Sequence, residues 1–277
     1  MEFTRTSELL PRVLWRESSP STNAELRELV RERAAAGEPL PDGTLLLTSD
    51  QTAGRGRLDR GWVTPPGQSI AASLLVRGAG AGLPLSWLPL LVGAAMSSAL
   101  QSRFGEGMRV GVKWPNDVHV RDEEDAIAGR PGLKLCGILC ELLPDGSVIV
   151  GTGINLLIPD FELPTGRATS LLAAGADVGG AETVFDPAGN ALIDEVLADY
   201  VTALRQLLAL AAENPAAARA RAARNSLTLG TEVRVHLPGD EIVDGRAREL
   251  ASDGSLVVDL PTGGQLTVSA GDVEHLR

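Results

Sequence analysis

Apolar and polar positions alternate in two ways along this chain, and the two periods predict different elements. Short, nearly continuous apolar runs bounded by turn residues are typical of buried strands. Such runs predict strands at Thr44–Thr48, Ser69–Val76, Val110–Trp114, Leu135–Leu142 and Ser147–Gly153. Apolar residues that recur every three or four positions are typical of helices that bury one face. That spacing predicts helices over 23–37, 86–103 and 190–212.

Cap and turn residues mark several of these boundaries. Thr22 and Glu25 stand at capping-box spacing, in which each side chain bonds the other residue's backbone N–H, and they predict the start of the first helix. Pro115 ends the strand before it, since proline has no N–H for a ladder. Pro144-Asp145-Gly146 predicts the turn of a hairpin. The charged segment Arg121–Gly132 carries glycines and predicts an exposed, mobile loop.

The pattern changes after Asn225, where an alanine-rich helix gives way to short alternating segments. Apolar residues then alternate with polar ones around Val233, Leu256 and Leu266, and glycine-containing pairs such as Gly239-Asp240 separate the segments. This spacing predicts several short strands of a small barrel or sandwich. We therefore expect one domain at 1–225 and a second at 226–277.

Composition places the chain among folded proteins with a sizeable core. Of 277 residues, 44% are hydrophobic and 22% are charged, with a formal net charge of −11. An acidic balance argues against nucleic acid as a main partner, because phosphate binding needs positive charge over a broad face. The apolar stretch at 83–100 is broken by prolines and serines and predicts a buried helix rather than a membrane span. The N-terminus has no apolar signal core, so we expect no membrane partner and a cytoplasmic location.

The two cysteines and three histidines predict neither a disulfide nor a zinc site. Cys136 and Cys140 would share one face of a strand about 13 Å apart, whereas a disulfide needs Cα atoms within about 7 Å. The histidines have no cysteine or carboxylate at zinc-ligand spacing. Both cysteines are expected to be small core residues.

Candidate chemistry gathers first in the segment Gly54–Trp62, which reads GRGRLDRGW. Glycine lets the backbone approach a ligand closely, and guanidinium groups hold phosphate or carboxylate through paired hydrogen bonds. Trp62 adds an aromatic face. On a chain of net charge −11 this is a concentrated positive loop, and it predicts a lid that closes over a small anion.

Lysine is rare in this chain, and its positions form a second signal. Of the 25 basic residues, only Lys113 and Lys134 are lysine. Lys113 opens the run Lys-Trp-Pro-Asn-Asp, where chance is a sufficient explanation. At Lys134 a compact ammonium, which a guanidinium cannot replace at a point-charge site, explains the choice at least as well as chance does.

Each motif also has a purely structural explanation. Ser21 and Thr22 could serve only as a helix cap, Pro115-Asn116-Asp117 could form only a turn, and the glycine–arginine segment could be a solvated loop. The chain has no glycine loop ending in Gly-Lys-Ser/Thr and no three-glycine dinucleotide fingerprint. The order and spacing of the motifs decide between these explanations.

In that order and spacing the chain resembles the biotin protein ligases. The motifs that match are jointly highly specific and extend from about Ser18 through the C-terminal strands. They are Ser21-Thr22-Asn23, Gln51 next to Gly54-Arg55-Gly56-Arg57, Arg60, Trp62, Lys113 to Asp117, Lys134 to Leu139 and Gly151 to Asn155. The resemblance implies an α+β fold, a mixed β-sheet flanked by helices as in class II aminoacyl-tRNA synthetases, with a small C-terminal SH3-like barrel.

The resemblance also implies a reaction in two steps. The carboxylate of biotin attacks the α-phosphate of ATP and gives biotinyl-adenylate and pyrophosphate. A lysine amine on a biotin carboxyl carrier domain of a carboxylase then displaces AMP. ATP and biotin are the expected substrates, and Mg²⁺ is implied through the phosphates, with Asp117 as a candidate ligand. A monomer or a weak homodimer is expected.

The family's functional residues carry over by position in the motifs. Lys134 and Arg57 are implied as catalytic, with Lys134 bridging the biotin carboxylate and the α-phosphate. Biotin-binding residues are implied at Ser21, Thr22, Asn23, Gln51, Gly54, Arg55, Gly56, Arg57 and Lys134. ATP-binding or adenylate-binding residues are implied at Arg55, Arg57, Arg60, Trp62, Asn116, Asp117, Lys134 and Asn155. Lys113 and Trp114 are expected to be partly structural.

The chain differs from the family pattern in two ways, and three other functions are considered. Only 20 residues precede Ser21, too few for the DNA-binding domain that makes some members repressors, so no DNA partner is expected. The segment Arg121–Gly132 is longer than is usual in the family. The alternatives are a lipoate-type ligase or transferase of the same fold, a non-catalytic biotin-binding protein, and nucleic-acid binding by the small barrel. Lys134 and the three arginines speak against the second, and the few basic or aromatic residues of the C-terminal strands speak against the third.

Overall fold

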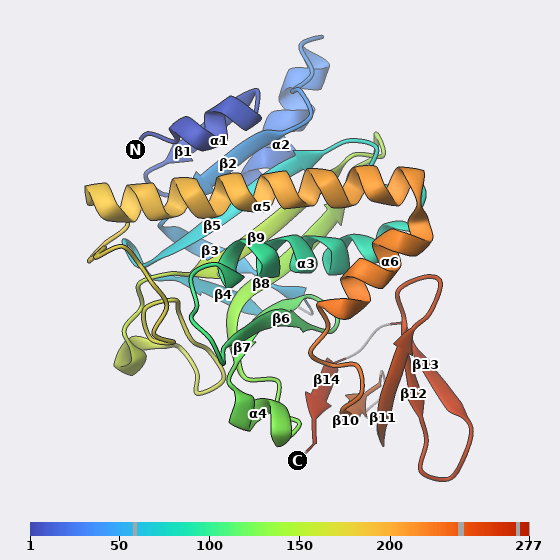
Figure 1. Ribbon diagram of the computed structural model, residues 1–277. Helices are drawn as coiled ribbons and strands as arrows, with labels where there is room; N and C mark the ends of the chain where they lie inside the picture. The colour runs from blue at the N-terminus through green and yellow to red at the C-terminus, as the bar shows by residue number, and fades with distance from the viewer. Residues whose placement is uncertain (58–59, 238–240, 270–271, 277) are drawn as a thin grey trace.

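A seven-stranded mixed sheet forms the centre of the molecule in the computed structural model, which describes residues 1–57, 60–237, 241–269 and 272–276 (Figure 1). In spatial order its strands are β1 (Arg12–Arg16), β2 (Thr44–Thr48), β5 (Ser69–Val76), β9 (Val148–Asn155), β8 (Leu133–Leu142), β7 (Asp117–Arg121) and β6 (Arg109–Lys113). β1 and β2 are parallel, and the other neighbouring pairs are antiparallel. The middle of the sheet therefore consists of β5, β9 and β8, and each of these strands contributes residues to the candidate site.

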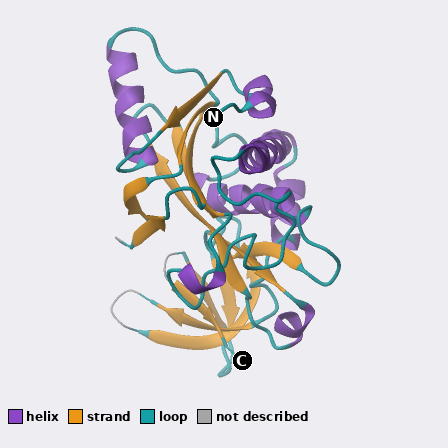
Figure 2. Ribbon diagram, turned by 90° about the vertical axis from the view of Figure 1, so that its left-hand side faces the viewer, coloured by secondary structure: helices purple, strands orange, loops and turns teal. Residues whose placement is uncertain are grey.

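Helices cover both faces of this sheet (Figure 2). Helix α2 (Thr22–Ala35) lies on one face, and α1 (Thr4–Leu9), α3 (Leu88–Gln101) and α5 (Pro187–Glu213) lie on the other. Leu45 and Leu47 of β2 join the core under α3 and α5, whereas Leu46 joins the core under α2. Successive side chains of a strand point to opposite faces, and here both faces are buried. This is why the central strands read as continuous apolar runs.

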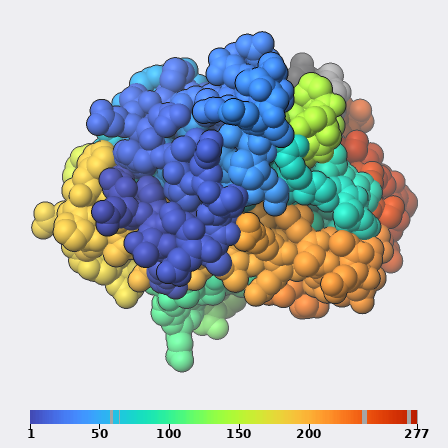
Figure 3. Space-filling model, turned by 90° about the horizontal axis from the view of Figure 1, so that it is seen from above, coloured from blue at the N-terminus to red at the C-terminus, as the bar shows by residue number. Residues whose placement is uncertain are grey.

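A buried carboxylate fastens the N-terminal helix to α5. Asp194 accepts hydrogen bonds from the backbone N–H of Thr6 at 2.8 Å, from Thr6 Oγ1 at 2.7 Å and from the backbone N–H of Arg5 at 2.9 Å. Seen from above, the N-terminal residues in dark blue lie against the orange helix (Figure 3). Neither α1 nor β1 was predicted, because each is a short element that gains its stability from this packing.

After α6 (Pro215–Arg224) the chain enters a separate five-stranded antiparallel sheet. Its strands, in spatial order, are β13 (Gln265–Val268), β12 (Leu256–Asp259), β11 (Ile242–Leu250), β10 (Glu232–His236) and β14 (Asp272–His275). The indole Nε1 of Trp87 donates to the carbonyl of Ser252 at 2.9 Å, and that of Trp114 donates to the carbonyl of Gly254 at 3.1 Å. These two tryptophans join the core of the small sheet to α3 and β6 in one apolar cluster.

The fold class predicted from the sequence is confirmed: a mixed sheet with helices on both faces, followed by a small all-β unit. Each strand and helix predicted in the first two hundred or so residues is present within a few residues of its expected bounds. The Pro144-Asp145-Gly146 turn joins β8 to β9. Both cysteines are free, as expected, and Gly239-Asp240 lies outside the described residues. Within the described ranges, no helix combines the length and apolar character needed to cross a bilayer.

Two of these local predictions were wrong. Helix α2 is capped by Ser21, not Thr22, and Glu25 bonds Arg16 and Ser19 instead of closing a capping box. The segment expected as a loop at 121–132 contains a short helix, α4 (Glu123–Ile127), capped by an aspartate side chain. The strand before Pro115 does end there, but the next strand was not predicted: the chain continues after Pro115 as β7, which pairs with β6 and β8. The strand expected at Val110–Trp114 begins and ends one residue earlier.

Candidate active site

Three parts of the fold line most of a cavity of about 150 Å³ on the α2 face of the sheet. They are the N-terminus of α2, the strands β8 and β9, and a hairpin of β3 (Gln51–Arg55) and β4 (Gly61–Thr64). The hairpin lies on the same side of the sheet as α2 (Figure 2). The glycine–arginine segment expected as a pliable loop is therefore paired in large part, with Gly54 opposite Trp62 and Arg55 opposite Gly61. Residues 58 and 59 of that segment lie outside the described residues.

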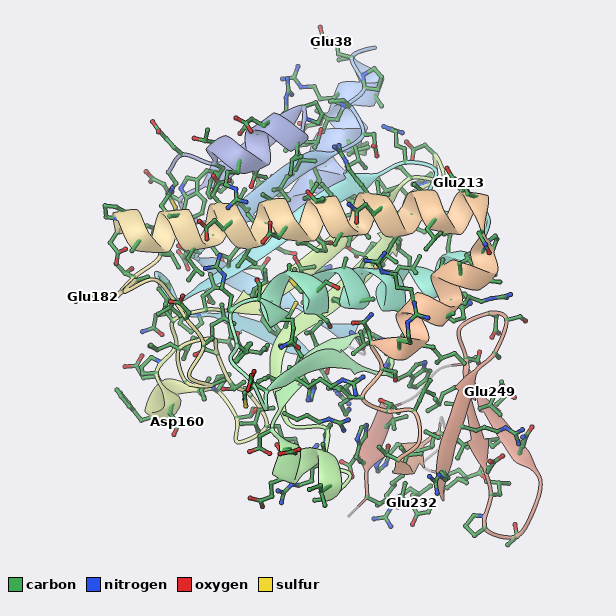
Figure 4. All side chains as sticks on the ribbon, in the orientation of Figure 1. Glu38, Asp160, Glu182, Glu213, Glu232 and Glu249 are labelled. Carbon is green, nitrogen blue, oxygen red and sulfur yellow. The ribbon has the colours of Figure 1, made fainter. Side chains whose placement is uncertain are left out.

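Positive charge is concentrated in this cavity. Five cationic side chains line it: Arg55, Arg57, Arg60, Lys113 and Lys134. They include both lysines of the chain, and Asp117 is the one carboxylate among the described lining residues. The acidic residues labelled in Figure 4 are exposed and stand at the outer edges of the molecule. A chain of net charge −11 thus presents a cationic cavity, an arrangement that attracts an anionic ligand.

Neighbouring side chains hold the cations in place. The ammonium of Lys134 lies 2.8 Å from Asp117 Oδ1 and 5.5 Å from the centre of the Trp62 ring. Arg57 donates a hydrogen bond to Asn116 Oδ1 at 3.1 Å, and Asn116 in turn donates to the carbonyl of Ile138 at 2.6 Å. The half-buried Lys134 and Arg57 are therefore both positioned by adjacent residues, Asp117 at the start of β7 and Asn116 in the turn before it.

Glycines on β8 and β9 form the floor of the cavity. A Cβ at Gly153 would lie 2.2 Å from the Trp62 ring, and one at Gly137 would lie 3.0 Å from it. A Cβ at Gly151 would lie 2.4 Å from the amide oxygen of Asn23. Gly137 and Gly153 are directly opposite each other on adjacent strands. The bare backbone thus makes the space into which Trp62 and Asn23 fit.

Polar groups line the other end of the cavity, where α2 begins. The backbone N–H of Thr22 donates to Gln51 Oε1 at 2.9 Å, which ties the helix to the hairpin. The amide nitrogen of Asn23 donates to the carbonyl of Leu139 at 3.2 Å. Ser21, Thr22 and Asn23 are all buried. This end therefore offers fixed hydrogen-bonding groups to a neutral polar ligand, next to the cationic end.

Most of the residues predicted for the site line this one cavity. Those that do are Ser21, Thr22, Asn23, Gln51, Arg55, Gly56, Arg57, Arg60, Trp62, Asn116, Asp117 and Lys134. Gly54 is paired in the hairpin and Asn155 donates to the carbonyl of Thr169 at 2.9 Å, and neither is among the described lining residues. Lys113, expected as partly structural, does line the cavity, whereas Trp114 is buried against the small sheet.

The glycine floor was not predicted from the sequence. A signal for it was present, since Gly151 and Gly153 are two residues apart and therefore share one face of a strand. Gly137 is the third member, and only strand pairing places it beside Gly153. The floor is a contact between residues far apart in sequence, which a linear motif does not reveal.

Two histidines, the buried His119 and the partly buried His275, lie close enough to Lys113 for its charge to shift their pKa values. Burial, followed by the positive charge of Lys113, lowers the pKa of His119 well below its usual value and lowers the pKa of His275 to about 4. Both rings are therefore neutral near pH 7. The positive charge of the cavity at that pH comes from arginine and lysine.

The donor set of the cavity does not form a metal cage. Among the described residues, no group of three or more histidine, cysteine, aspartate or glutamate side chains could hold a metal ion. Asp117 is already paired with Lys134. Magnesium commonly binds through one or two carboxylates together with substrate phosphates, so these residues fit an ion that a ligand's phosphates would hold and not one that the protein would hold by itself.

Two family models match the chain. Residues 17–157 match the biotin/lipoate A/B protein ligase family, and residues 228–276 match the biotin protein ligase C terminal domain. The first match contains all five cationic residues of the cavity. The second covers the small five-stranded sheet.

Individual relatives agree with these matches. The chain is 36% identical over 259 residues to the biotin--[acetyl-CoA-carboxylase] ligase of Mycobacterium tuberculosis, covering 93% of this chain and 86% of that protein. It is 31% identical over 173 residues to the bifunctional ligase/repressor BirA of Bacillus spizizenii, of which it covers 47%. The structure of the Aquifex aeolicus biotin protein ligase in complex with biotin and ATP superposes with a TM-score of 0.68 at 25% identity, covering 96% of this chain and 99% of that one.

Family models over both parts of the chain, a relative that it matches over most of its length and a shared fold around a cationic cavity lead to one conclusion. The chain belongs to the biotin/lipoate A/B protein ligase family, as one of its biotin protein ligases.

Proposed function

We propose that this protein activates biotin with ATP to biotinyl-5'-AMP and transfers the biotinyl group to a lysine of a biotin carboxyl carrier domain. One observation carries the proposal: a single cavity has a cationic end that holds both lysines of the chain and a neutral polar end at the start of α2. Biotin has the matching polarity, with an uncharged cyclic urea at one end and a carboxylate at the other. The names of the mycobacterial and Aquifex relatives support the same substrates.

In the first step an anion attacks a polyanion, and the cavity reduces the repulsion between them. A carboxylate oxygen of biotin forms a bond to the α-phosphorus while the bond from that phosphorus to the pyrophosphate oxygen breaks. An ammonium has three N–H donors, and one of those of Lys134 faces Asp117. The others can bridge the biotin carboxylate and the α-phosphate, and Arg57 and Arg55 add charge from the hairpin.

In the second step the carrier's neutral lysine amine attacks the acyl carbon of the adenylate. The new bond is an amide, the bond from the acyl carbon to the phosphate oxygen breaks, AMP leaves as an anion and the amine nitrogen loses a proton. The same cations stabilise the departing AMP. Trp62 lies across the glycine floor beside Lys134 and offers an aromatic face to the adenylate.

In this reaction magnesium would bind together with ATP. When bound, it would neutralise charge on the phosphate oxygens, and Asp117 is the carboxylate that could help hold it. The residues of the cavity orient the two substrates and supply the fixed positive charge.

Intact-mass measurement tests the proposed function. The purified protein is incubated with biotin, ATP, Mg²⁺ and a biotin carboxyl carrier domain, and the carrier is expected to gain one biotinyl group. Parallel reactions omit ATP or replace biotin with lipoate, and a carrier whose acceptor lysine is changed to arginine serves as the matched control. An unmodified carrier in the complete reaction, or efficient lipoylation in its place, would contradict the proposal.

A further inference from the structure

A carboxylate outside the cavity is joined to it by a chain of hydrogen bonds. Glu141 of β8 is not among the described residues that line the cavity. Its Oε2 accepts from Asn23 Nδ2 at 2.8 Å, and its Oε1 lies 2.5 Å from a guanidinium nitrogen of Arg27. Asn23 is buried and does line the cavity. The chain therefore leads from a partly exposed ion pair to the polar end of the site.

The atoms around Asn23 decide which way its amide points. Glu141 Oε2 and the carbonyl of Leu139 can only accept hydrogen bonds, so the NH₂ group must face both of them. The amide oxygen then faces Ser73 Oγ at 2.6 Å. Since that oxygen cannot donate, the single hydroxyl proton of the buried Ser73 is given to it.

The same proton count determines the role of Thr22. Its Oγ1 lies 2.8 Å from Ser73 Oγ and 3.2 Å from Gln51 Oε1. Because the proton of Ser73 is already used, Thr22 gives its own single proton to one of these two oxygens. Donation from Ser73 to Thr22 would leave the buried amide oxygen of Asn23 without a donor, which is unfavourable. Thr22 Oγ1 consequently has no proton left for a ligand and presents only lone pairs to the cavity.

We propose that Glu141 is a positioning residue: acting through Asn23 and Ser73, it holds Thr22 Oγ1 as a hydrogen-bond acceptor for a ring N–H of the ligand. The inference rests on the proposed function, in which this ligand is biotin with its cyclic urea. Gln51 complements it, because its oxygen accepts from the Thr22 backbone and its amide N–H groups remain for the urea carbonyl. A dithiolane ring has no N–H and gains nothing from this acceptor.

The substitution Glu141→Gln tests the direction of the chain. The amide has one acceptor oxygen where Asn23 and Arg27 each use one, and the permanently charged guanidinium takes it. The new NH₂ group then faces the NH₂ group of Asn23, which the carbonyl of Leu139 still holds in its orientation. Asn23 loses an acceptor and is pushed away from position 141, and this displaces Ser73 and Thr22 from their positions. In biotin-dependent pyrophosphate release the KM for biotin should rise roughly 10- to 100-fold, with kcat and the KM for ATP within about twofold.

The ion pair itself provides the matched control. Arg27→Met removes the same salt bridge but leaves the Glu141 carboxylate to accept from Asn23, so the KM for biotin should stay within about threefold of wild type. In the double variant the one oxygen at position 141 serves Asn23 alone, and the KM should return toward the wild-type value. Equal effects of the two single changes, with no recovery in the double variant, would reduce Glu141 to a salt-bridge partner and overturn the inference.

A second variant covers the case in which Glu141→Gln does not fold. Ser73→Ala interrupts the chain while Glu141 and Arg27 remain paired, and it should also raise the KM for biotin. An unchanged KM in a folded Ser73→Ala protein would overturn the inference.

A wild-type protein that releases no pyrophosphate refutes the proposed function, whereas an active wild-type protein with an insensitive Glu141→Gln variant refutes only the role of Glu141.

Discussion

Replacing Gly153 with alanine tests whether the floor of the cavity must be bare. The added Cβ would lie 2.2 Å from Cε2 and 2.4 Å from Nε1 of Trp62. Non-bonded carbon atoms prefer separations of about 3.5–4.0 Å, so the indole must retreat by at least about 1 Å. A displacement of that size at a reacting site can lower the rate about 100-fold. We therefore expect kcat/KM for biotinyl-adenylate formation to fall by about that factor.

Stability should change much less than activity in this variant. Overpacking a core costs about 1–3 kcal/mol, but Trp62 belongs to the two-stranded hairpin and not to the central sheet, so it can move. The lower end of that range corresponds to a fall in Tm of about 2–4 °C. Gly166→Ala is the control, because its Cβ meets nothing within 4 Å. Wild-type kcat/KM in a Gly153→Ala protein, measured by pyrophosphate release beside a thermal melt, would refute the reasoning about the floor.

Three further predictions concern charge. Lys134→Ala should lower the rate of adenylate formation by roughly 100-fold or more. Lys134→Arg should restore little of that rate, because a guanidinium donates in a plane. Near-wild-type adenylate yields by mass spectrometry in either variant would contradict the catalytic role proposed for Lys134. Since the pKa of His275 is about 4 in the folded chain and about 6.5 when unfolded, the unfolded state binds the proton first. The contribution of His275 to stability is therefore full above pH 6.5 and declines by about 3 kcal/mol as the pH falls to 4. His119 adds to the decline because its pKa is also lowered; denaturant titrations across that range should show the loss of stability, and His275→Gln should reduce its size. Burial raises the pKa of the fully buried Cys136 thiol, whereas Cys140 is partly exposed. Iodoacetamide at pH 8 should therefore label Cys136 only after unfolding, and rapid labelling of Cys136 in the native protein, located by peptide mass mapping, would count against its burial.

Much of the central sheet could be predicted from the sequence because both of its faces are buried. The apolar runs of β2, β5 and β9 have the length of a strand, so they predict buried strands. β7 was missed because Pro115 ends β6, and the next segment, Asp117–Arg121, has charged ends and a histidine at its centre. Only pairing with β6 and β8 makes it a strand. The β3–β4 hairpin was missed for the same reason, since glycine and arginine have little strand preference of their own.

Some residues of the candidate site could be predicted from the sequence, and others could not. Motifs that carry charge, such as the hairpin arginines and Lys134, stand out in an acidic chain, and the structure brings them into one cavity. Residues that act by making room or by orienting others leave no such trace. Gly137 matters because Gly153 pairs with it, and Glu141 matters because Asn23 reaches it across more than a hundred residues. These contacts depend on the register of β8 against β9 and on where α2 begins.

The most direct test of the cationic cavity is native mass spectrometry of the protein with biotin, ATP and Mg²⁺ and with no carrier present. The account predicts one bound biotinyl-adenylate per chain, together with an equal amount of released pyrophosphate, and the loss of both in Lys134→Ala. Bound biotin and unchanged ATP in the wild-type protein, with no adenylate formed, would contradict it.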